Sequence, residues 1–330
     1  MLSWFWLAEF AFTLAAYVVL DGFDLGVGIL SGIAGRSSLR EEMLASISPV
    51  WDGNGTWLVI AGTILWGAFP PVYSIVLPAL YVPLAAMLVG LIMRGVAIEF
   101  SHRAGQSRWV WDTLFFVGSL LAAFMQGVSV GTYVQGLPVS QLRYTGTGFE
   151  WCSAFPLWCG MALVLGYAVL GAGWLVLKGE GRLQQFGRTV ASRLTPLAML
   201  FAASIFVMTL VAHRVVEARW LAHPALFALP VLCLLAFFGS SQAARSGSSS
   251  RLPYVLAAAS CVLLLLTLAV SLLPYVVPFD VTIFDAAAPA STQEFMFWGA
   301  GLFVLPLIVV YTYVAYSVFR GKVNREHGYH

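Results

Sequence analysis

Nine long apolar runs divide this sequence and constrain its fold more than any other feature. A helix needs roughly 20 mostly apolar residues to cross a bilayer, and most of the runs reach that length. Only 10% of the 330 residues are charged and 60% are hydrophobic, whereas a soluble domain carries about 25% charged residues. We therefore predict an all-α membrane protein with about nine transmembrane helices, at Trp4–Leu30, Thr56–Phe69, Pro78–Ile98, Val110–Val134, Trp151–Leu177, Leu194–Val211, Leu221–Phe238, Leu252–Val276 and Phe295–Phe319.

Two of these runs are less regular than the others. The second is short, can be extended back to Trp51, and is followed by Pro70 and Pro71. Because proline lacks the backbone N–H and restricts the residue before it, we expect the second helix to end at this pair. The seventh run has His223 and Pro224 near its start, so its boundary is the least regular that we predict.

The basic residues of the predicted loops indicate how the helices cross the membrane. Of the 17 Lys and Arg residues, thirteen fall in alternate loops and the C-terminal tail, three fall in the other loops, and Arg94 lies inside a span. Cytoplasmic loops carry an excess of Lys and Arg. We therefore predict a periplasmic N-terminus and a cytoplasmic C-terminus. The thirteen are Arg36, Arg40, Arg103, Arg108, Lys178, Arg182, Arg188, Arg193, Arg245, Arg251, Arg320, Lys322 and Arg325, and the three are Arg143, Arg214 and Arg219.

Composition and motifs also exclude several classes of protein. The Met1–Leu30 stretch carries acids and lacks a basic start, so we interpret it as the first span and not as a cleaved leader. The scattered basic residues form no stripe of the kind that binds nucleic acid. The four cysteines form no C-x-x-C pair or histidine cluster, so no metal site is expected. The chain is predicted to be a single polytopic transmembrane domain over residues 1–330.

Five ionisable residues lie at predicted membrane depth: Asp21, Asp24, Asp52, Arg94 and Glu99. Such residues are costly in a bilayer, face protein or water, and often mark function. With the predicted orientation, all five lie in the cytoplasmic halves of the first three spans. Asp21 and Asp24 are three residues apart and therefore share a helix face. Short connections favour packing of these spans against each other, so we expect the charges to gather.

Two interpretations of these charges stay open. In the structural one, Arg94 is neutralised by Asp21 or Asp24, and the pair fixes the helix packing. In the functional one, the carboxylates of Asp52, Glu99, Asp21 and Asp24 conduct protons from the cytoplasm towards a buried site. Position near the inner surface suits an entrance at Asp52 and Glu99, although Glu99 also fits a solvated helix end.

Histidines are placed where they would not ligate a haem inside the bundle. His102, His213, His223, His327 and His330 all fall in loops, tails or span ends. Haem iron needs an axial ligand such as His, Met or Cys, and the methionines at span depth have no neighbouring histidine in the sequence. We expect no cofactor to be bound by this chain alone.

Several segments resemble subunit II of cytochrome bd-type quinol oxidases. V-L-D-G-F-D-L-G-V-G-I-L at Val19–Leu30 resembles the family's first helix, and S-P-V-W-D-G-N-G-T-W-L at Ser48–Leu58 resembles its second. The family's third helix is similar to Gly90–Phe100. Ala68–Tyr73 also matches, and two looser matches near the C-terminus are Thr282–Ala288 and Leu305–Thr312. The short length of the chain and the sequence around Arg94 are most similar to those of the cyanide-insensitive branch of this family. Gly55 departs from the pattern, because family members carry Glu or Gln there.

The resemblance implies a function that cannot be inferred from the residues of this sequence alone. It implies a haem-free partner of a haem-bearing subunit I, in which haem b and haem d are held. Together they would oxidise quinol and reduce oxygen to water in the bacterial inner membrane. No catalytic residue is expected in this chain, which would instead support assembly and the access of protons and oxygen. A small single-span subunit, membrane lipids and a structural quinone are further partners compatible with the family.

Particular residues acquire roles through the same resemblance. Asp52 matches an acid of a cytoplasmic proton path, and Trp57 matches a tryptophan near an oxygen entry route from lipid. On physical grounds alone, Trp57 fits a packing or interface aromatic as well. Asp21, Asp24, Arg94 and Glu99 match charged positions of the family.

Two rival functions remain open at this stage. A secondary transporter would bind its substrate with intramembrane charges, but transporters favour internal repeats and midplane sites. This sequence shows no strict repeat, and its charges lie towards one side. The second rival is a purely structural scaffold for subunit I.

Overall fold

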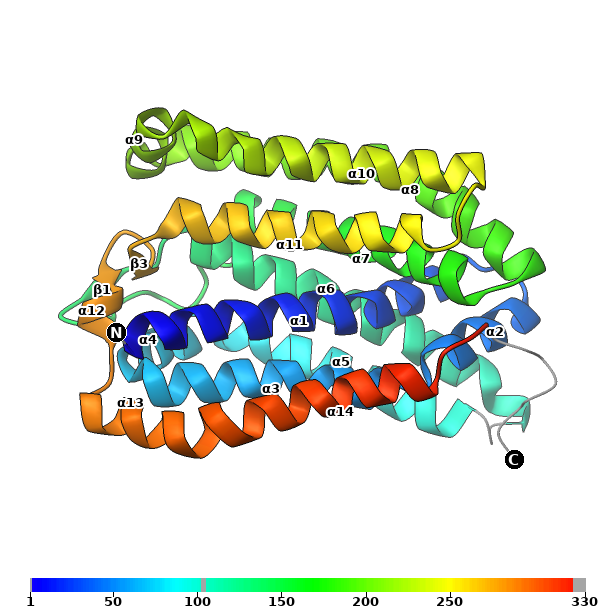
Figure 1. The fold of residues 1–330 in the computed structure, drawn as a ribbon, viewed down its shortest axis with the longest axis horizontal. Coiled ribbons are helices and arrows are strands. Elements are labelled where there is room, and N and C mark those ends of the chain that lie inside the picture. The colour runs from blue at the N-terminus through cyan, green and yellow to red at the C-terminus, as the bar shows by residue number, and fades with distance from the viewer. Residues whose placement is uncertain (1, 102–104, 323–330) are drawn as a thin grey trace.

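The chain folds into a bundle of long helices aligned with one axis (Figure 1). The structure, a computed structural model, describes residues 2–101 and 105–322. Among these residues, eight helical segments are long and apolar enough to span a membrane. They are α1 (Leu2–Ser31), α5 (Tyr81–Ser101), α6 (Arg108–Gln135), α7 (Ala154–Lys178), α8 (Gly181–Ala212), α10 (Ala228–Ser246), α11 (Leu252–Leu272) and the last segment, which joins α13 (Ala290–Met296), the π-helical η3 (Phe297–Val304) and α14 (Leu305–Val318).

The remaining predicted span corresponds to α3 (Trp51–Ala68), which packs against α1. Its first turn holds Asp52 and Asn54, and these polar residues keep α3 below the hydropathy of the other eight. The chain enters at one end of the bundle and α14 finishes at the other (Figure 1). An odd number of passes is required for that arrangement, so α3 supplies the ninth.

Short elements connect the long helices at the two ends. α2 (Ser37–Ile47) follows α1, and η1 (Gly105–Ser107) precedes α6. At the other end lie α4 (Pro70–Ala79), α9 (Arg214–Ala222), η2 (Pro224–Phe227) and α12 (Ile283–Ala286). Two small antiparallel hairpins pair β1 (Val139–Ser140) with β2 (Arg143–Tyr144) and β3 (Tyr275–Val277) with β4 (Val281–Thr282).

Most predicted boundaries agree with the structure, and the exceptions have local causes. α3 ends one residue before Phe69, and α4 begins at Pro70, as the prolines predict. The prediction of one span over Leu221–Phe238 was wrong at its start, because His223 separates α9 from η2, η2 begins at Pro224, and the long α-helix begins only at Ala228. The single domain over 1–330 stays a prediction.

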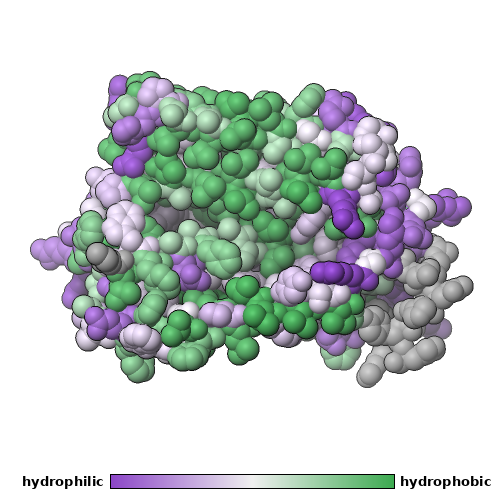
Figure 2. Space-filling view, in the orientation of Figure 1, coloured by the Kyte–Doolittle hydropathy of each residue, from purple (hydrophilic) through white to green (hydrophobic). Residues whose placement is uncertain are grey.

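One end of the bundle, which we call the basic end, carries Arg36, Arg108, Lys178, Arg182 and Arg251 at the ends of α1, α6, α7, α8 and α11. Arg143, Arg214 and Arg219 belong to elements at the opposite end. A broad hydrophobic band separates the two ends on the face shown in Figure 2, and hydrophilic residues gather beyond it. Arg103, Arg325, His102, His327 and His330 lie outside the described residues.

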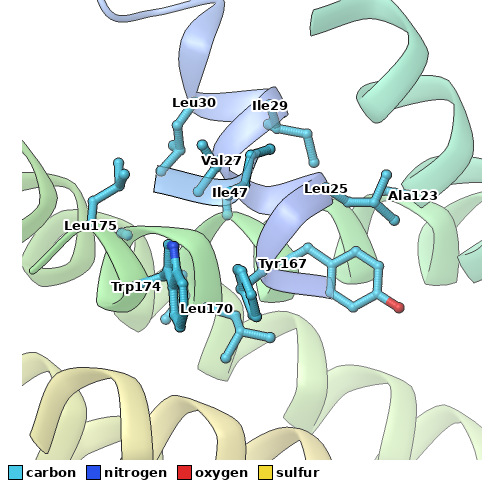
Figure 3. Packing of buried hydrophobic residues seen from close by; sticks show 14 of the residues in the cluster. Leu25, Val27, Ile29, Leu30, Ile47, Ala123, Tyr167, Leu170, Trp174 and Leu175 are labelled. Atoms are coloured by element: carbon cyan, nitrogen blue, oxygen red, sulfur yellow. The ribbon is translucent and has the colours of Figure 1, made fainter. Parts of the chain in front are cut away.

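The core is centred on the C-terminal half of α1, which is buried from Asp21 to Ser31. Figure 3 shows Leu25, Val27 and Leu30 of α1 facing Tyr167, Leu170, Trp174 and Leu175 of α7. The Phe23 ring stacks on Trp174 with 3.9 Å between ring centroids. Gly26 and Gly171 bring the two backbones together, since a Cβ on Gly171 would lie 2.5 Å from the Gly26 carbonyl carbon. Small residues allow such close helix approach in membranes.

Candidate functional site

A buried cluster of charged side chains lies between α1, α3 and α5, in the half of the bundle nearer the basic end. Asp21 and Asp24 of α1 are fully buried, and Arg94 of α5 is 3% exposed. The two acids share a helix face because they are three residues apart. Burial of charges is tolerated when they are paired or hydrogen-bonded, so the partners of each group decide what the cluster can do.

Asp21 and Arg94 form a direct ion pair. The Nη1 of Arg94 lies 2.7 Å from the Oδ1 of Asp21, and both side chains are almost completely shielded from solvent. The structure therefore selects Asp21 from the two partners that the sequence offered for Arg94. Removing either partner of such a pair leaves an uncompensated buried charge.

Asp24 is held by a different kind of contact. The Nδ2 of Asn54 donates a hydrogen bond of 2.7 Å to the Oδ2 of Asp24 and a second one of 3.2 Å to the backbone oxygen of Leu20. The Tyr316 hydroxyl of α14 donates to the Oδ1 of Asn54 at 2.9 Å. The Oδ1 of Asp24 has no hydrogen-bond partner among the described residues. Asn54 thus links Asp24 to the last helix.

A second polar group lies next to the acids. The Nε2 of Gln126 donates to the Tyr17 hydroxyl at 2.6 Å, and the Tyr167 hydroxyl donates to the Oε1 of Gln126 at 2.9 Å. Tyr17 is one helical turn before Asp21 on α1. These three buried residues extend the polar interior from α1 to α6 and α7, and no sequence pattern predicts them.

Asp52 and Glu99 do not join the buried cluster. Both are exposed on this chain: Asp52 lies in the first turn of α3 and Glu99 near the end of α5. Asp52 is two residues before Asn54, and Glu99 is five residues after Arg94. The structure therefore brings three of the five predicted ionisable residues together and leaves two on the surface near the basic end.

Trp57 lies one turn further along α3 than Asn54. Its side chain is 2% exposed and meets the Phe12 ring edge-to-face, with 5.8 Å between ring centroids. The indole N–H has no hydrogen-bond partner among the described residues. Trp57 is thus part of the packing between α1 and α3 in this chain.

Residues that could hold a metal or a haem iron are sparse in the described part of the chain. No group of three His, Cys, Asp or Glu side chains is positioned to hold a metal ion there. His213 and His223 both flank α9 at the end opposite the basic end. His213 stacks on Phe279, and burial lowers its pKa.

Asn54 and Tyr316 were also not predicted from the sequence as site residues. Asn54 belongs to the W-D-G-N stretch and so lay within a recognised motif. Tyr316 is 262 residues away from it in the chain, and one tyrosine in an apolar helix gives no signal of this contact.

Comparisons with known proteins cover almost the whole chain. The family model described as cytochrome bd terminal oxidase subunit II matches residues 2–319. Cytochrome bd-I ubiquinol oxidase subunit 2 of Escherichia coli (strain K12) is 28% identical over 366 residues, covering 99% of this chain and 96% of that protein. Cytochrome bd ubiquinol oxidase subunit 2 of Bacillus subtilis (strain 168) is 26% identical over 333 residues, covering 97% and 96%.

A solved structure has the same fold. The bd oxidase from Geobacillus thermodenitrificans contains a chain that superposes with a TM-score of 0.77 at 18% identity, covering 96% of this chain and 98% of that one. At this identity the likeness concerns the fold alone.

Proposed function

The chain belongs to the cytochrome bd terminal oxidase subunit II family, and from this premise we propose that it is the haem-free subunit of a quinol oxidase. The single observation that carries the proposal is the family match over residues 2–319. Oxidation of quinol and reduction of oxygen to water would take place in the complex. This chain would contribute assembly, and access for protons and oxygen.

The chain is a multi-pass membrane protein of a family whose complexes are cytochromes, and haem is therefore part of the complex. We place haem b and haem d in the partner, subunit I. In support, His213 and His223 flank the short helix α9 and lie outside the membrane-spanning helices. Other side chains that could ligate iron pack in the core without histidine partners among the described residues. These are Met87, Cys159, Cys233 and Cys261.

We propose that the basic end faces the cytoplasm of the bacterial cell and that the N-terminus is periplasmic. The excess of Lys and Arg at that end supports this orientation. Protons consumed in forming water would enter from the basic end, whereas those released from quinol would leave on the other side. The vectorial separation generates a membrane potential without a pump.

Asp52 and Glu99 are the proposed entrance to the proton route, and Asp21 and Asp24 are its buried members. The exposure of Asp52 and Glu99 near the basic end supports an entrance, and the burial of Asp21 and Asp24 suits an interior relay. Arg94 keeps a structural role through its ion pair with Asp21.

Trp57 is proposed to border an oxygen route between α1 and α3, and its apolar contact with Phe12 suits a non-polar gas. Subunit I, membrane lipids, a structural quinone and a small single-span subunit are the partners that we propose.

The complex itself provides the first test. Purification of the chain with its natural partners should yield a coloured sample with haem absorption and quinol-dependent oxygen uptake. A colourless chain without partners that exchanges a solute would instead identify a transporter.

The Asp52→Asn variant tests the proton entrance. Because asparagine cannot carry a proton, oxygen uptake should fall at least tenfold, while the haem spectrum and the yield of complex stay normal. Glu41→Gln, which removes a carboxylate of α2 at the same end, is the matched control and should leave turnover unchanged. Normal turnover in Asp52→Asn would leave the scaffold role as the better account.

A further inference from the structure

We propose that Asp24, and not Asp21, is the buried carboxyl that takes up and releases a proton, and that Asn54 and Tyr316 position it for exchange at the seam between α3 and α14. The inference rests on the proton route proposed above and narrows its two buried members, Asp21 and Asp24, to Asp24 as the group that exchanges the proton. It assigns different tasks to two acids that the sequence presents as equivalent, and it adds two positioning residues.

Asp21 is fixed as the charged member of the cluster. Its Oδ1 lies 2.7 Å from the Nη1 of Arg94, and the two side chains are 0% and 4% exposed. Protonation of Asp21 would leave the guanidinium charge buried without its counter-ion, which is strongly unfavourable. Arginine itself does not lose its proton in proteins. The pair therefore retains its charges and cannot carry the exchangeable proton.

Asp24 has the opposite environment. Its side chain is fully buried, and the described residues provide it with no ion pair. The Oδ2 accepts from Asn54, whereas the Oδ1 has no partner. A cluster with two carboxyls and one guanidinium holds one surplus negative charge if both acids are ionised. A proton on the free Oδ1 removes that surplus at lower cost than a second bare anion in the same site.

The other titratable groups around Asp24 do not compete for this proton. Asp21 and Arg94 satisfy each other's charge. Tyr254 on α11 and Tyr316 on α14 also lie near Asp24, and a phenol, whose ordinary pKa is about 10, is neutral at physiological pH. Asp24 is consequently the group of this cluster whose charge can change.

The seam between α3 and α14 offers the route to it. Tyr316 donates to the Oδ1 of Asn54, and the Nδ2 of Asn54 donates to Asp24. A pocket of about 20 Å³ borders both of these residues, together with Pro49, Gly53 and Tyr311. That volume suffices for one water molecule. Asp24 does not line this pocket, and Asn54 lies between the pocket and the carboxyl. We infer that a hydronium at the pocket supplies the proton that Asp24 takes up and is left as water, and that release reverses the transfer.

Infrared spectroscopy of the intact complex tests the assignment directly. A protonated carboxyl buried in protein gives a C=O stretching band that shifts when H2O is replaced by D2O. We expect this band in the wild type and expect Asp24→Asn to remove it. If the band persisted in the Asp24→Asn complex, the proton would reside elsewhere and the assignment would be wrong.

Tyr316→Phe tests the positioning residues while both acids remain in place. Loss of one hydrogen bond to Asn54 should shift the Asp24 band and slow proton-limited turnover roughly two- to tenfold. Tyr313→Phe is the matched control, because Tyr313 is on the same helix and 67% exposed, and it should change neither measurement. An unshifted band in Tyr316→Phe, or the same shift in Tyr313→Phe, would overturn the proposed positioning.

The failure of this inference is distinguishable from failure of the proton route itself. If Asp52→Asn lowered turnover but Asp24→Asn left the infrared band unchanged, the assignment of the proton to Asp24 would be rejected and the proton route would stand. Normal turnover in Asp52→Asn would reject the route, whereas the infrared band would still report which buried acid holds a proton.

Discussion

Replacement of Arg94 by Leu would leave the Asp21 carboxylate buried without the cation that it pairs with. Breaking a buried pair from one side costs about 3–5 kcal/mol. We expect Arg94→Leu to lower the yield of assembled complex and to lower its Tm in detergent. The two quantities can be measured by fluorescence-detected size-exclusion chromatography before and after heating.

The double variant Asp21→Asn with Arg94→Leu is the control for that experiment. It removes both charges, so it should recover much of the stability that Arg94→Leu loses. If the double variant were as unstable as the sum of the two single variants, the residues would not act as a pair.

The sequence predicted this residue pair incompletely. Charge balance at membrane depth indicated that Arg94 needs an acid, but Asp21 and Asp24 are on one face and only three-dimensional packing distinguishes them. The roles of Asn54 and Tyr316 were not predicted, because neutral polar residues cost less than charged ones in membrane helices and here the contact is with a partner far away in the chain.

At the scale of helices, the approach of α1 to α7 depends on glycine. A Cβ on Gly26 would collide with the backbone carbonyl of Tyr167, and backbone cannot move aside as a flexible side chain can. We expect Gly26→Ala to separate the two helices and to destabilise the bundle by about 1–3 kcal/mol. Thermal unfolding of the purified complex measures the effect.

Gly166→Ala provides the matched control on α7. A Cβ at Gly166 would meet nothing within 4 Å, and alanine favours helix by up to about 1 kcal/mol relative to glycine. This variant should be neutral or slightly stabilising. Equal losses in both variants would show that helix contact at Gly26 is not the cause.

The loop between α6 and α7 has its own pH dependence. Burial acts to raise the pKa of Glu150, but hydrogen bonds from the Tyr144 hydroxyl (2.6 Å) and the Thr147 backbone N–H (2.8 Å) outweigh it and lower the pKa to about 2. The ordinary value is 4.5. Because the folded pKa is the lower one, this stabilisation is present above pH 4.5 and is lost as the pH falls through about 2.

Hydrogen exchange of residues 139–150 should therefore increase as the pH falls from 4.5 towards 2, after correction for intrinsic rates. In Glu150→Gln the protection should already be low at neutral pH and should no longer depend on pH over that interval. A wild-type loop whose protection is constant down to pH 2 would contradict the role of Glu150.

The long apolar runs predicted the helices and most of their ends well, and a few ends poorly. Val110–Val134 lies within α6, and Leu252 begins α11 as predicted. α8 extends well before the predicted Leu194 because its polar first turns protrude beyond the apolar run. The π-helical η3 inside the last segment was not predictable, since F-W-G-A-G-L-F-V suits an ordinary helix equally well.

For the molecule as a whole, the orientation in the membrane can be tested with a native thiol. Cys152 is exposed on the loop before α7, at the end opposite the basic end, whereas Cys159, Cys233 and Cys261 are buried. A membrane-impermeant maleimide should label Cys152 from the periplasmic side of spheroplasts, and Cys152→Ser should abolish that labelling. Labelling only in inverted vesicles would reverse the orientation and remove the proposed cytoplasmic proton entrance.

The ion pair between α1 and α5 also has a consequence for biosynthesis. α1 leaves the ribosome with Asp21 and Asp24, long before Arg94 is made. An acid within a nascent span opposes insertion, by up to about 2.5–3.5 kcal/mol at the helix centre, so α1 should stay beside the insertion machinery until α5 arrives. Chains truncated before Arg94 should crosslink through α1 to that machinery. In chains that include α5, α1 and α5 should move into lipid together, with Asp21 paired to Arg94.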